Sequence, residues 1–182
     1  MALKSTIYKI KLNVSDMDRP HYGEYALTVA RHPSENDERM MVRVLAFALH
    51  ASESLRFGRG LSTEDEADLH ETDLTGAISL WLDVGLPDER LVRKAAGRAD
   101  RVVVLTYGRT AVQWWEQAKG TLAKLANLTV YRLAPADTQA LAALAQRGME
   151  LQCIVQEGQI WFGDDSAMLQ PVLETVHRLS AD

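Results

Sequence analysis

Alternating apolar and polar side chains predict two long β-strands at the start of the chain. In residues 4–14 (KSTIYKIKLNV) and again in residues 25–32 (YALTVARH), an apolar side chain recurs at every second position. This is the spacing of a strand that buries one face. The apolar positions are Ile10, Leu12 and Val14 in the first segment, preceded by Ile7 and less cleanly by Tyr8, and Tyr25, Leu27 and Val29 in the second. Because the turn-like SDMDRPHYGE lies between them, we expect a long hairpin.

Helical spacing replaces this alternation in residues 34–51. Apolar side chains recur there every three or four residues, which is typical of a helix with one buried face. Ser34 is the predicted N-cap, because a serine hydroxyl can accept a free N–H of the first turn. Asp37 and Glu38 extend the apolar stripe at its N-terminal end. The helix dipole favours acids near a helix start, but it does not require two of them on the inner face.

A strand–helix–strand unit is predicted in the middle of the chain. Residues 77–84 alternate, residues 88–97 follow as a helix, and RVVVLTYG at 101–108 is a nearly continuous apolar strand. Short links between these elements predict a right-handed βαβ unit with parallel strands. Ligands favour the carboxyl ends of such strands. Asp83 lies at such an end, on the face that also carries Trp81.

The remaining pattern completes an α/β fold. We expect strands at 54–61 and 128–133, helices at 111–126, 135–146 and 166–179, and a hairpin over 149–164 that turns at Glu157–Gly158. Residues 62–76 carry six acids in fifteen positions, which is typical of a solvated loop. With no repeat and no shift in composition, the chain is predicted to be one α/β domain over residues 1–182, with a mixed β-sheet flanked by helices.

Composition and charge narrow the function. The 182 residues carry a net charge of −5, whereas non-specific nucleic-acid binding usually needs a basic surface. A nucleic-acid partner would therefore have to bind through a local patch. No apolar run approaches the roughly 20 residues that span a bilayer, and Cys153 is the only cysteine. We expect a cytoplasmic protein with no membrane partner, in which Cys153 is a small core residue.

Carboxylates from separate elements are the remaining candidates for chemistry. No phosphate-binding glycine loop, nucleophile elbow or HExxH pair occurs. Glu38 begins a buried stripe, Asp68 lies in the acidic segment and Asp83 ends a strand. Mg²⁺ takes a few such oxygen ligands and keeps several waters. The alternative is that all three are ordinary surface acids or helix caps.

Long blocks of the sequence resemble the YaeQ family of proteobacterial proteins. These are MALKSTIYKIKLNVSDMDR, ARHPSENDERMMVRVLAFALHA, the pattern DLTG-I-LW--VGLPDER, and the WW at 114–115. The resemblance runs over essentially the whole chain. It implies a divergent branch of the PD-(D/E)XK nuclease fold, whose core is a helix, three strands, a helix and a further strand. Carboxylates and a lysine bind Mg²⁺ at the edge of the sheet in that fold. The pattern above shows two strands before the second helix.

The resemblance also assigns residues to that motif. Ala67-Asp68 matches the Pro-Asp pair without its proline, and Asp83-Val84-Gly85 matches the (D/E)-x-K tripeptide with glycine in place of lysine. Glu38 matches an acid often found on the first helix. Lys94, on the following helix, is the nearest replacement for the lysine. The buried stripe of that helix excludes Lys94, however, so a solvated lysine is the competing interpretation.

Two functions follow as expectations. The first is a metal-dependent nuclease or phosphodiesterase that acts on nucleic acid, with Asp68, Asp83 and Glu38 as ligands of Mg²⁺, or of Mn²⁺ as its substitute. Lys94 would be an electrostatic helper. The second is a non-catalytic interaction module that keeps the nuclease-like fold. Net acidity and Gly85 favour the module, and acids on three elements favour the enzyme.

Overall fold

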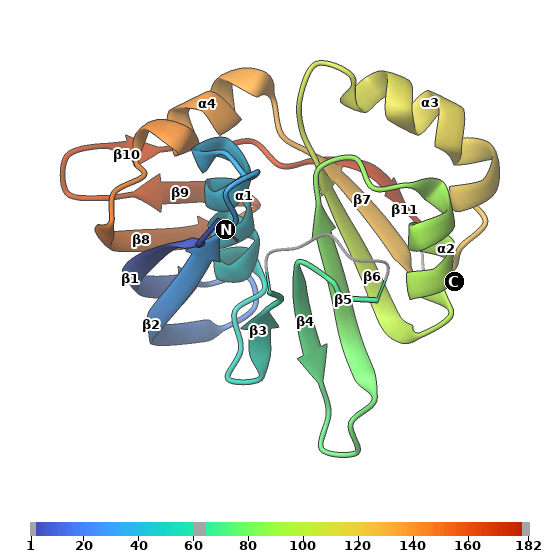
Figure 1. Ribbon diagram of the computed structural model, residues 1–182, viewed down its shortest axis with the longest axis horizontal. Helices are drawn as coiled ribbons and strands as arrows, with labels where there is room; N and C mark the ends of the chain where they lie inside the picture. Colours follow the sequence, from blue (N-terminus) through green and yellow to red (C-terminus); the bar gives the residue numbers. More distant parts are fainter. Residues whose placement is uncertain (1–2, 60–64, 180–182) are drawn as a thin grey trace. The chain divides into compact units, whose positions relative to one another are not determined.

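The computed structural model describes residues 3–59 and 65–179, which form two β-sheets and their helices (Figure 1). The chain divides into two compact units. One comprises the residues up to Ser52 together with Ala136–Val172, and the other comprises Glu53–Pro135 and the residues from Leu173 onward.

The first unit is built on a five-stranded sheet. Its elements are β1 (Thr6–Asp16), β2 (His21–Arg31), α1 (Asp37–Leu49), α4 (Pro135–Ala143), β8 (Gly148–Gln156), β9 (Gln159–Gly163) and β10 (Met168–Leu169). The strand order is β10-β9-β8-β1-β2. β1 pairs antiparallel with β2 and parallel with β8, which makes the sheet mixed.

One face of this sheet is buried and the other is open. Ile10, Leu12 and Val14 of β1 are almost completely buried, on the face that packs against α1. Lys9, Lys11 and Asn13 alternate with them and are exposed. The alternation in the sequence therefore separates core from solvent as predicted. Ile7, which breaks that alternation, is 40% exposed.

The second unit is built on a six-stranded sheet. Its elements are β3 (Leu55–Phe57), β4 (Leu69–Thr72), β5 (Ile78–Val84), α2 (Glu89–Ala96), β6 (Ala99–Thr106), α3 (Ala111–Leu122), β7 (Leu128–Arg132) and β11 (Glu174–Arg178). The order is β11-β7-β6-β5-β4-β3, with β5, β6 and β7 parallel. Trp81, Val102 and Val104 form one hydrophobic cluster with Val92 and Ala95 of α2 and with Ala118 and Leu122 of α3. The predicted βαβ unit is β5-α2-β6.

The fold class is confirmed: the chain is a mixed α+β protein whose sheets are flanked by helices. The strands are distributed over two mixed sheets, where the sequence pattern predicted one. Both hairpins are confirmed. Glu157 and Gly158 occupy the β8–β9 turn with positive φ angles of 50° and 73°, as a two-residue hairpin turn requires.

The predicted helix at 166–179 is wrong. This segment forms β10, an irregular link and β11, which pairs antiparallel with β7. Its apolar residues do follow a helical spacing. Pro171 interrupts any helix that would span the segment, however, and the β-branched Val172, Thr175 and Val176 favour extended backbone.

The acidic segment and its neighbours also differ from the prediction. Leu69–Thr72, inside the expected loop at 62–76, forms β4 between β3 and β5. The strand predicted at 54–61 is limited to Leu55–Phe57, and positions 60–64 lie outside the described residues. α1 begins at Asp37, and its N-cap is Asn36, whose side chain accepts the Arg39 N–H at 2.9 Å. Ser34 instead contacts His32.

Candidate functional site

Asp83 lies one residue before the carboxyl end of β5, on the face that was predicted from alternation. The indole N–H of Trp81, two residues earlier, donates to Asp83 Oδ2 at 2.9 Å. Trp81 itself is 5% exposed and belongs to the hydrophobic cluster under α2 and α3. The aromatic core of the second unit therefore fixes the orientation of the Asp83 carboxylate.

Asp68 immediately precedes β4, and backbone N–H groups link it to Asp83 by hydrogen bonds. The backbone N–H of Asp68 donates to Asp83 Oδ1 at 3.2 Å. The Asp68 carboxylate in turn accepts the backbone N–H of Val84 through Oδ2 at 2.9 Å. Only 7% of Asp68 is exposed. Two of the predicted ligands, far apart in the sequence, thus lie side by side where the start of β4 meets the end of β5.

Gly85 follows this pair, at the position where the resemblance placed a lysine. Its φ angle is +91°, a conformation that L-residues with a side chain rarely adopt. Its N–H donates to the Leu105 carbonyl at 2.9 Å, which holds this position to β6. The backbone geometry gives a physical reason for glycine here.

Lys94 lies on the exposed side of α2 and forms an ion pair with Asp65. Its Nζ is 3.0 Å from Asp65 Oδ1, and Arg98 approaches the same oxygen at 3.4 Å. The hydrogen bond from Lys94 and its charge, followed by Arg98, hold the pKa of Asp65 below its usual value. The exposed position of Lys94 agrees with the helical phase. A role for Lys94 at Asp68 and Asp83 stays a prediction.

Glu38, the third predicted ligand, belongs to the other unit. It lies in the first turn of α1, where the Thr138 hydroxyl of α4 donates to its Oε1 at 3.0 Å. The neighbouring Asp37 forms an ion pair with Arg31 and accepts a hydrogen bond from the Tyr8 hydroxyl at 3.4 Å. The first unit thus accounts for the local contacts of both acids, and convergence of Glu38 with Asp68 and Asp83 stays a prediction.

The donor set at Asp68 and Asp83 fits a divalent cation in part. Within residues 3–59 and 65–179, no group of three or more His, Cys, Asp or Glu side chains is arranged to hold a metal ion. Two adjacent carboxylates are nevertheless the kind of ligand that Mg²⁺ uses when water and substrate phosphate complete its shell. The pair therefore fits a metal shared with a substrate better than a fully protein-enclosed one.

Cys153 and the tryptophan pair occupy structural positions. Cys153 is completely buried, and burial raises the pKa of its thiol to about 12, which is the opposite of an activated nucleophile. Trp114 donates its indole N–H to the Pro87 carbonyl at 2.9 Å. Trp115 packs on His177, with ring centroids 5.3 Å apart. The two tryptophans hold α3 to its neighbours.

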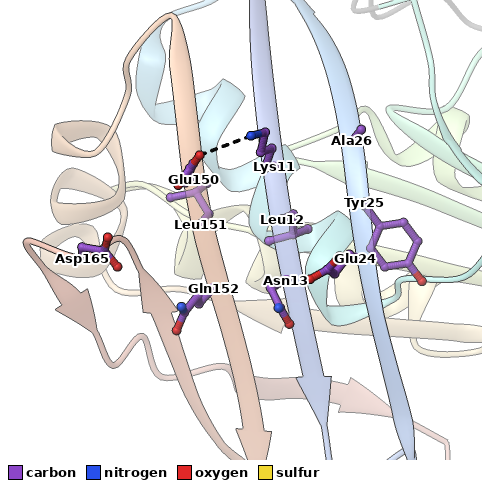
Figure 2. Close-up of a pocket in the computed structure, with 10 residues that line it drawn as sticks. All are labelled: Lys11, Leu12, Asn13, Glu24, Tyr25, Ala26, Glu150, Leu151, Gln152 and Asp165. Carbon is purple, nitrogen blue, oxygen red and sulfur yellow. Dashed lines mark hydrogen bonds and ion pairs between the residues drawn. The ribbon is translucent and has the colours of Figure 1, made fainter.

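A hollow that sequence reasoning missed lies on the open face of the five-stranded sheet. Figure 2 shows its lining on β1, β2 and β8, with Asp165 beyond β9. It measures about 500 Å³. The strand register sets Glu24, Asn13 and Gln152 in one row and Ala26, Lys11 and Glu150 in the next. In the sequence, the signal for this hollow was the alternation in β1 and β2, whose exposed positions lie along it.

Comparison with known proteins establishes the family. The model of the family described as "YaeQ protein" matches residues 1–172. The chain belongs to the YaeQ family. It is 46% identical to "Uncharacterized protein YaeQ" of Salmonella typhi over 165 residues, which are 90% of this chain and 91% of that protein. With the protein of the same name from Escherichia coli strain K12, identity is 44% over 171 residues, or 93% and 94% of the two chains.

Solved YaeQ structures have the same fold. The YaeQ protein of Xanthomonas axonopodis pv. citri superposes with a TM-score of 0.92 at 44% identity, covering 96% of this chain and 99% of that one. The YaeQ protein of Pseudomonas syringae superposes with a TM-score of 0.90 at 34% identity, covering 98% and 97%. The family resemblance in the sequence is thereby confirmed. Separately, no helix of the described residues is long and apolar enough to cross a membrane.

Proposed function

We propose that this YaeQ protein is a divergent metal-dependent phosphodiesterase that acts on nucleic acid. The observation that carries the proposal is the Asp68–Asp83 pair. The Asp83 carboxylate accepts the backbone N–H of Asp68, and the Asp68 carboxylate accepts the backbone N–H of Val84, the residue after Asp83. Carboxylates brought together in this way repel each other, and a divalent cation relieves that repulsion. A bound Mg²⁺ would supply a Lewis acid and an activated water for phosphodiester hydrolysis.

The order of elements supports the same proposal. Between α1 and α2 the chain forms β3, β4 and β5, and β6 follows α2. This order along the chain agrees with the helix, three strands, helix and strand that the resemblance to the YaeQ family implies for a nuclease-like core. The strand that the pattern did not show is β4. We propose that Asp68, immediately before β4, and Asp83, near the end of β5, correspond to the two motif acids.

The chain's own residues would have distinct tasks. Asp68 and Asp83 bind the cation, and Trp81 fixes the orientation of Asp83 through its N–H bond. Glu38 is proposed as the third ligand, direct or through water. Lys94 is proposed to leave Asp65 and neutralise substrate phosphate, because Gly85 supplies no ammonium group.

Metal binding is the first test. We expect millimolar Mn²⁺ to raise the melting temperature of the wild type, since a ligand at a hundredfold excess over Kd stabilises the folded state by about 2.7 kcal/mol. Asp83→Ala should lose this shift, whatever its own melting temperature. Asp100→Asn is the matched control, because Asp100 is an exposed acid on β6 of the same sheet and should keep the full shift. An equal shift in Asp83→Ala would refute a shared site.

Cleavage is the second test and separates the enzyme from the interaction module. Fluorescent single-stranded and duplex oligonucleotides of DNA and RNA are incubated with the wild type and Mn²⁺. Cleavage that Asp83→Ala abolishes and Asp100→Asn retains supports the phosphodiesterase. A metal-induced shift without cleavage of any substrate would contradict catalysis and favour a nuclease-like module that has kept only its metal ligands.

A further inference from the structure

The sheet edges of this protein are not equally protected. A sheet edge presents unpaired backbone groups, and proteins usually limit it with short strands, bulges, proline or lysine. Among the described residues, β10 and β3 end their sheets with two and three residues. β11 has five, and its register is interrupted between Thr175 and His177. β2 is an edge strand of eleven residues.

β2 also lacks the other protective devices. Its register with β1 is continuous from Arg31 to His21, without a bulge. The strand, HYGEYALTVAR, contains neither proline nor lysine. Three residues of β2 (Glu24, Ala26 and Thr28) are exposed, and of these three only Glu24 is charged. The edge is therefore long and free of bulges, and its side chains at these three positions are exposed.

The hydrogen-bond pattern identifies which backbone groups of β2 point outward. The N–H of Lys9 donates to the Arg147 carbonyl, next to β8. Since successive residues of a strand direct their backbone groups to opposite sides, odd-numbered residues of β1 face β8 and even-numbered ones face β2. The even-numbered Leu12 lies opposite Tyr25, so odd-numbered residues of β2 face β1. The outward groups belong to the even-numbered Tyr22, Glu24, Ala26, Thr28 and Ala30.

One of these outward groups already has a partner that fits this assignment. The buried guanidinium of Arg43 on α1 donates to the Ala30 carbonyl at 3.0 Å. The Arg43 side chain can reach the Ala30 carbonyl because this carbonyl points away from β1. The edge is thus closed at Ala30, whereas among the described residues the outward backbone groups from Tyr22 to Thr28 have no such partner.

We propose that this stretch pairs with β2 of a second copy of the chain, antiparallel about a two-fold axis at Ala26. Ala26 then lies opposite its own copy, and Glu24 lies opposite Thr28 of the other copy. These residues all direct their N–H and C=O groups across the interface, so about six backbone hydrogen bonds form, two for each such pair. The two five-stranded sheets become one continuous sheet.

The side chains favour this occupant over an unrelated extended peptide. On the face toward α1, Tyr25 would pair with Leu27 of the other copy, and both are half-buried in a single chain. Apolar cross-strand pairs of this kind stabilise a sheet. On the open face, the Glu24 carboxylate would meet the Thr28 hydroxyl. A self-complementary strand satisfies both faces at once, as a two-fold interface requires.

Cysteine cross-linking tests the register. In Ala26→Cys the two new cysteines face each other at a Cα–Cα separation of about 5.5 Å, which a disulfide spans. Mild oxidation should convert most of this variant to a species of twice the 20.3 kDa chain mass. Thr28→Cys is the matched control on the same exposed face; its copies are separated by four residues, or about 13 Å, and should stay uncross-linked. Native Cys153 is buried and does not interfere.

Sedimentation tests the association itself. Wild type at high micromolar concentration should sediment as a dimer. Ala26→Pro should sediment as a monomer with an unchanged circular dichroism spectrum, because the lost N–H points away from β1. A monomeric wild type would overturn the proposal and assign the edge to an extended peptide from another protein. A dimer that survives Ala26→Pro, or cross-links equally through Thr28→Cys, would overturn it as well.

Discussion

Both units of the protein bury carboxylates, and Glu35 and Asp68 are accommodated differently. Glu35 in the first unit is 8% exposed, and Asp68 in the second is 7% exposed. Glu35 receives charged donors: Arg43 Nε lies 2.9 Å from its Oε2 and Arg39 Nη1 lies 2.6 Å from the same atom. Asp68 accepts the backbone N–H of Val84 and gives its own N–H to a second carboxylate, Asp83.

The difference indicates what each acid contributes. A carboxylate matched by guanidinium groups forms a brace, which holds the start of α1 to the end of β2 through Arg43 and Ala30. A carboxylate that is oriented by N–H groups beside another carboxylate keeps its negative charge concentrated at one point. The first arrangement stabilises the fold, whereas the second is the one at which we propose that a cation binds.

Removing the charge of Glu35 should have the largest effect. Glu35→Gln leaves Arg43, which is 1% exposed, as a buried charge with its carboxylate missing, and breaking such a pair costs about 3–5 kcal/mol. Urea denaturation measures the free energy of unfolding. Asp37→Asn is the control, because its partner Arg31 is partly exposed and such pairs contribute about 1 kcal/mol or less. Equal losses in the two variants would remove the distinction between brace and surface pair.

Placing a lysine at position 85, where the proposed nuclease motif has one, should have an intermediate effect. Gly85→Lys forces an L-residue into a φ of +91°, and we expect a loss of about 1–3 kcal/mol in stability. Gly120→Ala is the control, since Gly120 lies inside α3 with open space around it and should gain about 0.5–1 kcal/mol. Urea melts of both variants check this. A Gly85→Lys variant as stable as the wild type would mean that the backbone does not explain the missing lysine.

The sequence predicted the fold where one face of an element is buried. Alternation identified β1, β2 and β5 because their two faces differ in exposure. It failed at Met168–Arg178, where apolar spacing resembled a helix, and at β4, whose four residues lie among acids. Short strands depend on their neighbours for stability, so their own pattern carries little information.

The candidate site was predicted only in part. The face of Asp83 follows from its place two residues after Trp81, which is local information. The contact between Asp68 and Asp83 depends on pairing β4 with β5, and the sequence pattern did not show β4. The contact between Lys94 and Asp65 likewise joins residues from separate elements. Long-range pairs of this kind required the structure.

The smallest expected effect concerns a basic side chain, His177, and the dependence of stability on pH. Among the described residues no group hydrogen-bonds to the buried Nε2 of His177, which packs on Trp115. Burial lowers the pKa of His177 from its usual 6.5. The unfolded chain therefore takes up a proton first as the pH falls, and stability declines from pH 6.5 down to the folded-state pKa. Thermal melts from neutral to mildly acidic pH should show a shallower decline in His177→Gln than in the wild type. His32→Gln, in the other unit, should keep the wild-type slope; the same slope in all three proteins would show that the unpartnered nitrogen has no energetic consequence.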